Sequence, residues 1–164
     1  MSKVEGLEYS KNLVEKARNL VENAEKELQK CFGTCSNVVL SCQQATELCA
    51  KAIFKATGLD FPKEHQLLFD QRKKVRPEVI ELLKKEFPKN FVYRDKIPRI
   101  IFLTYFWHSF YAIAKYGLND ANIPPDKLFS REDAELALKH AKECIEVADN
   151  LLIQKELRKE NNSF

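Results

Sequence analysis

Hydrophobic residues recur at helical spacing along most of this chain. An amphipathic helix is predicted over about residues 7–31, where apolar side chains follow one another at intervals of three and four. A second helix is predicted over 35–57, and its inner positions are Val38, Cys42, Ala45, Cys49, Ala52 and Ala56. Side chains this small let neighbouring helices approach closely, so we expect the second helix at the centre of the fold.

The second half of the chain continues the helical pattern. Proline at the first position opens a short helix over 77–87. A helix over about 96–117, with Asp95 as its N-cap, is apolar nearly all round, which is typical of a helix buried in a bundle or in an oligomer interface. Ser130 begins a capped helix that runs over 131–157.

The connections complete the predicted architecture. Gly58 and Gly117 are expected to end helices, and one helical turn is expected at residues 66–69. The pattern predicts an all-α fold, an antiparallel up-and-down bundle of four long helices plus one short helix. We expect a single domain over residues 1–164, with its core over about 7–157 and a C-terminal tail that frays.

Composition narrows the class of protein. The chain has 164 residues, of which 45% are hydrophobic and 31% charged, so it is long enough and apolar enough to bury a core. No apolar run is long enough to cross a bilayer, and the N-terminus lacks the apolar core of a signal peptide. We therefore expect a cytoplasmic protein with no membrane contact.

The cysteines favour reduced thiols in the core. The chain has five cysteines, an odd count that argues against a disulfide framework. Cys35, Cys42 and Cys49 repeat every seven residues and so share one helical face. No C-x2-C pair of the kind found in zinc sites is present. We expect small core residues, with neither a metal nor a cofactor.

Positive charge gathers in one segment. The formal net charge is +3, but residues 71–99 hold ten basic and four acidic side chains, a local charge of +6 that leaves −3 elsewhere. A solvated surface is the simpler interpretation, and attraction of phosphate or nucleic acid is the alternative. The candidate basic patch comprises Arg72, Lys73, Lys74, Arg76 and Arg94.

A polar stripe runs along the apolar helix over 96–117. Thr104, His108, Tyr111 and Lys115 are spaced by four, three and four residues, so they lie on one face. Buried polar groups need hydrogen-bond partners. The stripe predicts either a nucleotide or phosphate cleft, with Lys115 supplying charge, or an ordinary dimer seam. Trp107 on the same helix is expected in the core.

A second polar stripe lies on the helix over 35–57. Gln43, Glu47 and Lys51 are each four residues apart, which predicts either a simple Glu–Lys pair or, as we favour, a polar network between helices that sets the bundle register. His65 is expected to hold the following loop in place rather than to act in catalysis. His140 is expected at the surface.

Three segments carry a resemblance to a known family. The positions of the first are Gln43, Gln44, Ala45, Glu47, Lys51, Ala52, Gly58, Pro62, His65 and Leu67. The second is Ala114-Lys115-Tyr116, and the third is the last helix, REDAELALKHAKECIEVADNLL. Together they cover about residues 10–155, and they resemble the HEPN family (higher eukaryotes and prokaryotes nucleotide-binding domain). The resemblance adds Tyr116 to the candidate nucleotide-binding residues.

The resemblance implies several activities. Many HEPN proteins are metal-independent ribonucleases with an Arg followed four to six residues later by a His, usually assembled across a dimer. Here Arg99 precedes His108 by nine residues, and Arg131 precedes His140 by nine. Nine residues make about 2.5 helical turns, so Arg99 and His108 are expected on opposite faces. Other members partner nucleotidyltransferases, often in toxin–antitoxin pairs, or are implicated in nucleotide binding.

These observations favour a binding module over an enzyme. We expect a HEPN-like helical bundle that forms a homodimer through the helix over 96–117. It would bind a nucleotide or RNA, or partner a nucleotidyltransferase in a toxin–antitoxin-like context. Two alternatives stay open: a metal-independent ribonuclease with a degenerate site, and a scaffold that binds no ligand.

Overall fold

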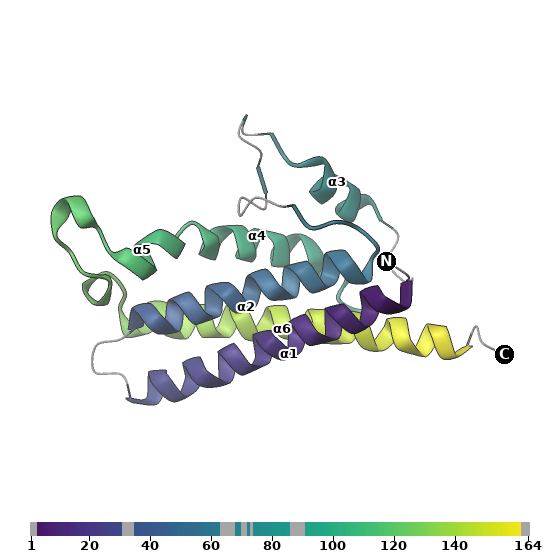
Figure 1. Ribbon diagram of the computed structural model, residues 1–164, viewed down its shortest axis with the longest axis horizontal. Coiled ribbons are helices and arrows are strands. Elements are labelled where there is room, and N and C mark those ends of the chain that lie inside the picture. The colour runs from purple at the N-terminus through teal and green to yellow at the C-terminus, as the bar shows by residue number, and fades with distance from the viewer. Residues whose placement is uncertain are drawn as a thin grey trace.

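The computed structural model describes residues 3–30, 35–62, 68–69, 72, 74–85 and 91–161. It is an up-and-down helical bundle in which the long helices α1, α2, α4 and α6 alternate in direction along the chain, while the short helix α3 stands to one side (Figure 1). The helices are α1 (Lys3–Lys30), α2 (Cys35–Ala56), α3 (Pro77–Lys84), α4 (Ile97–His108), α5 (Tyr111–Tyr116) and α6 (Arg131–Asn161). The predicted all-α bundle is confirmed.

Helix α2 lies at the centre of the bundle and contacts α1, α4, α5 and α6. Its predicted inner face is buried, because Val38, Cys42, Ala45, Cys49 and Ala52 all have no exposed surface. The facing positions of α6 are also small, and Ala134, Ala137, Ala141 and Cys144 are fully buried there. Small residues on both helices bring the backbones close, as the sequence predicts.

Helix α2 ends at Gly58, as predicted, in a Schellman motif. The Leu59 N–H donates to the Phe54 carbonyl at 3.0 Å, and the Gly58 N–H donates to the Lys55 carbonyl at 3.0 Å. Gly58 has a φ of 75°, the left-handed conformation that this motif requires. The Lys85 ammonium also donates to the Thr57 carbonyl, which ties the segment after α3 to the end of α2.

Helix α6 begins with the predicted cap. The Asp133 N–H donates to Ser130 Oγ at 3.2 Å, and the Ser130 N–H donates to Asp133 Oδ2 at 2.9 Å. This reciprocal pair is a capping box that satisfies backbone donors at the helix start. The helix continues to Asn161, so the predicted end near residue 157 was four residues short.

The single helix predicted over 96–117 is wrong in one respect, because it is divided between α4 and α5. The Ser109 hydroxyl donates to the Phe106 carbonyl at 2.5 Å. In a regular α-helix the Phe110 N–H would donate to this same Phe106 carbonyl, four residues back. Here it donates to the Trp107 carbonyl at 3.1 Å, three residues back. A serine side chain that competes for a backbone carbonyl in this way disturbs the regular helical ladder.

Three smaller expectations also differ. Asp95 is not the N-cap of α4, because it lies in a 3-10 turn, Arg94–Lys96, and no side-chain cap is bonded at Lys96. Helix α3 ends at Lys84 rather than 87, since Lys85 is already extended. Of the turn predicted at 66–69, residues 66 and 67 lie outside the described residues, and Phe69 forms an isolated antiparallel bridge with Val75.

Within the described part of the chain, every helix is too short or too polar to be a candidate for crossing a membrane.

The two glycines with positive φ make a matched pair of stability tests. Gly58→Ala should lower the free energy of unfolding by about 1–2 kcal/mol, because the strain is conformational and the nearest atom to an added Cβ is Lys85 Nζ at 3.9 Å. Gly117→Ala should lower it by roughly 3 kcal/mol, since the added Cβ would also collide with the Ile123 carbonyl. Urea unfolding measures both, and equal losses would contradict this order.

Candidate functional site

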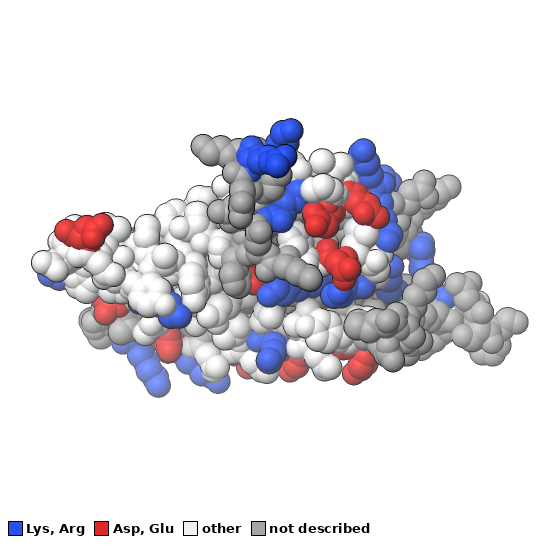
Figure 2. Space-filling model, turned by 45° about the horizontal axis from the view of Figure 1, so that its top comes forward, with Lys and Arg blue, Asp and Glu red and all other residues white. Residues whose placement is uncertain are grey.

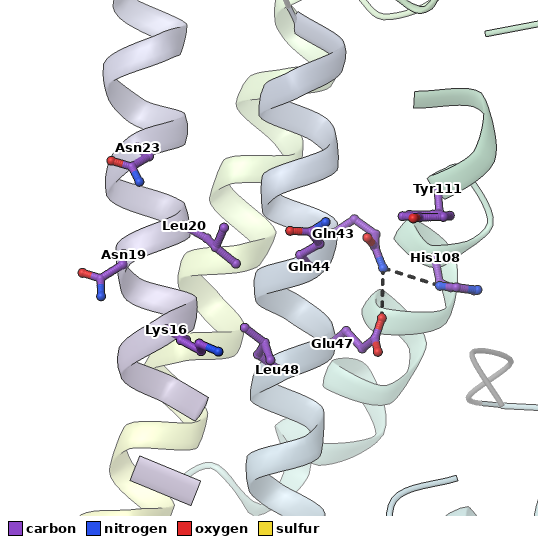
Figure 3. Close-up of a pocket in the computed structure, with 10 residues that line it drawn as sticks. All are labelled: Lys16, Asn19, Leu20, Asn23, Gln43, Gln44, Glu47, Leu48, His108 and Tyr111. Carbon is purple, nitrogen blue, oxygen red and sulfur yellow. Dashed lines mark hydrogen bonds between the residues drawn. The ribbon is translucent and has the colours of Figure 1, made fainter. Parts of the chain in front are cut away.

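A groove of about 560 Å³ lies across the face of α2 that is turned toward α1 and the α4–α5 junction. In Figure 3, α2 forms its middle, with α1 on one side and His108 and Tyr111 on the other. The lining residues are Lys16, Asn19, Leu20, Asn23, Gln43, Gln44, Glu47, Leu48, His108 and Tyr111. Most of these side chains are polar, which distinguishes the groove from the apolar core beneath it.

Helical spacing accounts for how each element presents its residues. Residues 16, 19, 20 and 23 of α1 follow the intervals of three and four that share one face. Residues 43, 44, 47 and 48 do the same on α2. His108 is the last residue of α4 and Tyr111 the first of α5, so the break between these helices sets how the two rings lie.

A chain of polar contacts crosses from α2 to α4. Lys51 Nζ pairs with Glu47 Oε1 at 2.7 Å. Gln43 Nε2 donates to Glu47 Oε2 at 3.3 Å and lies 3.4 Å from His108 Nδ1 (Figure 3). Because the amide nitrogen can only donate, His108 Nδ1 is the acceptor in this contact. The structure thus brings together the polar residues that the sequence placed on two separate stripes.

Gln43 is the most buried member of this chain of contacts. Its side chain is only 2% exposed, and its Oε1 is a buried acceptor without a hydrogen-bond partner among the described residues. A buried acceptor without a partner destabilises the folded state by about 1–3 kcal/mol. Such atoms are few in folded proteins, and they commonly mark a site where another group binds.

The aromatic side of the groove comes from His108 and Tyr111. Their rings are nearly parallel, with 8° between the planes and 6.2 Å between the centroids. Lys115 Nζ donates to the Tyr111 hydroxyl at 3.0 Å and also lies 5.1 Å from the centre of the Tyr116 ring. The hydrogen bond to Tyr111 raises the pKa of Lys115, so the ammonium is charged at neutral pH.

The remaining predicted residues lie elsewhere. Thr104 is buried and donates to the Ile100 carbonyl at 2.9 Å and the Thr46 carbonyl at 3.3 Å, so it does not line the groove. Lys115 and Tyr116 are exposed beyond the rim. Lys73 and His65 are outside the described residues.

The candidate basic patch is separate from the groove. Arg72, Lys74 and Arg94 are exposed, Arg76 is half-buried, and none of the four lines the groove. Blue and red side chains are mixed on the face of the molecule that carries α3 (Figure 2). The acidic residues of α3 belong to the same segment and are already included in its local charge of +6.

Sequence reasoning missed the contribution of α1. Lys16, Asn19 and Asn23 line the groove, although they belong to no motif. Asn19 and Asn23 are four residues apart on either side of the half-buried Leu20, and that pattern is also typical of an ordinary solvated helix face. No signal in the sequence tells these two cases apart.

His140 also differs from its prediction as a surface residue. Trp107, buried as predicted, donates from Nε1 to His140 Nδ1 at 3.2 Å. Arg99 donates to Glu143 at 2.9 Å on the same side of α6. Burial lowers the pKa of His140 below its ordinary value of 6.5, and the charge of Arg99 lowers it further. Arg99 therefore faces α6 whereas His108 contacts α2, so the two are on different sides of α4, as predicted.

Among the described residues, no group of three or more His, Cys, Asp or Glu side chains is arranged to hold a metal ion.

The fold and the groove together define a class of protein, an α-helical bundle with a polar groove on its central helix. A comparison with protein families matches the HEPN domain over residues 10–151, and the chain belongs to that family. No curated protein and no solved structure gave a significant match. At the level of the family, membership associates the chain with nucleotide- and RNA-related modules.

The buried position of His140 predicts how stability depends on pH. The unfolded chain binds a proton on this histidine near pH 6.5, whereas the folded protein binds it only at lower pH, so the unfolded state holds more protons in between. The free energy of unfolding should therefore decrease as the pH falls from 7 through 6.5 and below. In the variant His140→Gln, whose amide oxygen is also an acceptor for Trp107, this decrease should be smaller.

Urea unfolding at a series of pH values measures the effect. Burial raises the pKa of Glu143, but the hydrogen bond from Arg99 outweighs this effect and the pKa is lowered below 4.5. The contribution of Glu143 to the free energy of unfolding is therefore lost only at more acidic pH. The two windows are therefore separate. Identical pH profiles of the variant and the unmodified protein between pH 7 and 5 would contradict the role of His140.

Proposed function

We propose that the groove binds a nucleotide, free or within single-stranded RNA, and that the protein is a HEPN-type binding module. The observation that carries this proposal is the near-parallel His108–Tyr111 pair beside the buried amide of Gln43, whose carbonyl oxygen has no partner among the described residues. Aromatic rings beside amide groups suit a planar base that has both a face and hydrogen-bonding edges.

The size of the groove supports a ligand of this kind. Its volume of about 560 Å³ is within the range of roughly 300–1,000 Å³ that is typical of small-molecule sites. A base at the Tyr111 ring would gain stacking energy of about 1–3 kcal/mol. His108, whose Nδ1 lies 3.4 Å from Gln43 Nε2, lines the same groove and adds a second ring beside the ligand.

The polar lining supports recognition of a base and a phosphate. Asn19, Asn23 and Gln44 are exposed amides, and amide side chains pair well with the edges of bases. Lys16 lines the groove, and Lys115 lies beside Tyr111, so each can supply positive charge to a phosphate. Glu47 adds little net negative charge because it is paired with Lys51.

We favour binding over catalysis. The nuclease spacing that the family uses is absent from this sequence, and Arg99 is engaged by Glu143 on α6. His108 has its Nδ1 held by Gln43. A metal-independent ribonuclease with degenerate residues is the alternative. Incubation of the protein with end-labelled RNA tests it. Cleavage that persists in a Lys115→Ala/His108→Ala double variant would point to a contaminant.

A reducing compartment fits the cysteines, so we place this function in the cytoplasm. The cysteines within the described residues are all buried: Cys35, Cys42, Cys49 and Cys144. Burial raises the pKa of Cys42 to about 12 and raises those of Cys49 and Cys144 as well, so these thiols stay protonated and unreactive.

Tyr111→Ala should weaken nucleotide binding by about tenfold, because it removes the ring on which the base would stack. Fluorescence anisotropy with a labelled adenine nucleotide and, separately, a labelled single-stranded RNA measures the dissociation constants. The two ligands distinguish a site for free nucleotides from a site for RNA.

Tyr111→Phe is the matched control for this experiment. It keeps the ring and loses only the hydroxyl that accepts from Lys115, so binding should stay within about twofold of the unmodified protein. Lys139→Ala, on α6 and away from the groove, should have no effect. Equal affinities for the alanine variant and the unmodified protein would disprove the stacking role, and no binding by the unmodified protein would disprove the function.

A row of aromatic residues on α4 supports a homodimer as a second element of the proposal. Phe102 is 52% exposed and stacks on Phe106 with 6.0 Å between ring centroids, and Phe106 contacts Phe110 at 5.2 Å. Phe102 and Phe106 lie four residues apart on α4, and Phe110 follows the end of this helix. Phe106 and Phe110 are partly buried against the core, so the exposed Phe102 extends an apolar row to the surface. Members of the family often form dimers.

Light scattering should therefore report about twice the chain mass of 19.1 kDa at micromolar concentration. Phe102→Lys should shift the protein to a monomer, because it places a charge in the apolar row. Leu136→Lys, at an exposed leucine of α6, should remain a dimer. A 19.1 kDa monomer of the unmodified protein would exclude the homodimer, and a nucleotidyltransferase of a toxin–antitoxin pair would then be the partner to test.

A further inference from the structure

The hydrogen bonds of Gln43 determine which group it presents to a ligand. Its Nε2 donates to Glu47 Oε2 and lies within hydrogen-bond distance of His108 Nδ1, so both N–H groups are directed to acceptors. Its Oε1 is left without a partner in the described part of the chain. The side chain therefore offers the groove an acceptor and no donor.

The orientation of this amide is fixed by charge. A reversed amide would place the carbonyl oxygen against the Glu47 carboxylate, and two acceptors repel each other. Glu47 cannot easily turn away, because its other oxygen is paired with Lys51 at 2.7 Å. The exposed amides of Gln44, Asn19 and Asn23 lack this restraint, so each is able to present either its oxygen or its nitrogen to a ligand.

We infer that the groove selects nucleobases that carry an amino group, as adenine does, because the locked Gln43 amide presents only its carbonyl oxygen to the ligand. This inference rests on the proposed nucleotide binding. An amino group donates to Oε1 and satisfies a buried acceptor, whereas a base without a donor at that position leaves it unpaired. A base with a carbonyl at that position would be repelled.

The place of Gln43 in the groove also indicates how the ligand reaches it. Oε1 is buried, so the amino group makes contact only when a group that covers this oxygen moves. The His108 and Tyr111 rings line the groove beside Gln43, at the break between α4 and α5, where the regular helical ladder is interrupted (Figure 3).

A pair of nucleotides that differ by one amino group tests the selectivity. Adenosine 5′-monophosphate and purine riboside 5′-monophosphate share the ring, the sugar and the phosphate, and only the first has the amino group. Isothermal titration of the full-length protein should give about tenfold tighter binding for adenosine 5′-monophosphate. In Gln43→Met, which has a similar length but no amide, the ratio of the two affinities should fall to near one.

Lys139→Met, on α6 and away from the groove, is the control and should leave the affinity ratio unchanged. If Gln43→Met does not fold, Glu47→Gln serves in its place, since it removes the charge that orients Gln43 and should lower the ratio while adenosine 5′-monophosphate still binds. Equal binding of both nucleotides by the unmodified protein would overturn the selectivity and leave the proposed function intact. No binding of either would overturn both.

Discussion

The close packing of α2 against its neighbours is the constraint on which the rest of the structure depends. Its inner positions carry only small or β-branched side chains, and those from Val38 to Ala52 have no exposed surface. A larger side chain there would force the helices apart, because packed cores have few voids to absorb extra volume. The same packing surrounds α2 with α1, α4, α5 and α6.

A central helix leaves little solvent for its own polar residues, and this explains the groove. Gln43 is nearly buried and Glu47 only partly exposed, so their polar groups must find partners within the protein. Lys51 and His108 supply most of these partners, and Gln43 Oε1 has none within the described part of the chain. A locally unfavourable group in an otherwise consistent fold is typical of a functional site.

Much of the fold was predictable because its signals are local. Helical periodicity located most of the helices within a few residues, and the positive φ of Gly58 follows from its place after α2. Ser130 and Asp133 form a capping box, which two residues three positions apart specify. The break at Ser109 was missed, because a serine within an apolar helix is compatible with both a continuous and an interrupted ladder.

The candidate site was less predictable. The stripe from Thr104 to Lys115 was predicted to share one face, but Thr104 lies inward at the Thr46 carbonyl and Lys115 lies outside the groove. Equal spacing along a helix says which residues share a face, but the depth of each depends on the curvature and ending of the helix and on the neighbour it meets. The break after His108 changed where the helix ends and which neighbours the later residues of the stripe meet.

The sequence by itself determined most of the helices, the ends at Gly58 and Ser130, the central place of α2 and the resemblance to the HEPN family, because each depends on spacing along the chain. Only the tertiary structure decided that Gln43 meets His108, that Lys16 and Asn19 of α1 face the same groove, and that His140 accepts from Trp107. These contacts join residues far apart in the chain, and no local pattern encodes which faces of separate helices meet. The physical reason is that side-chain packing and the burial of polar groups are settled jointly by all the helices in contact.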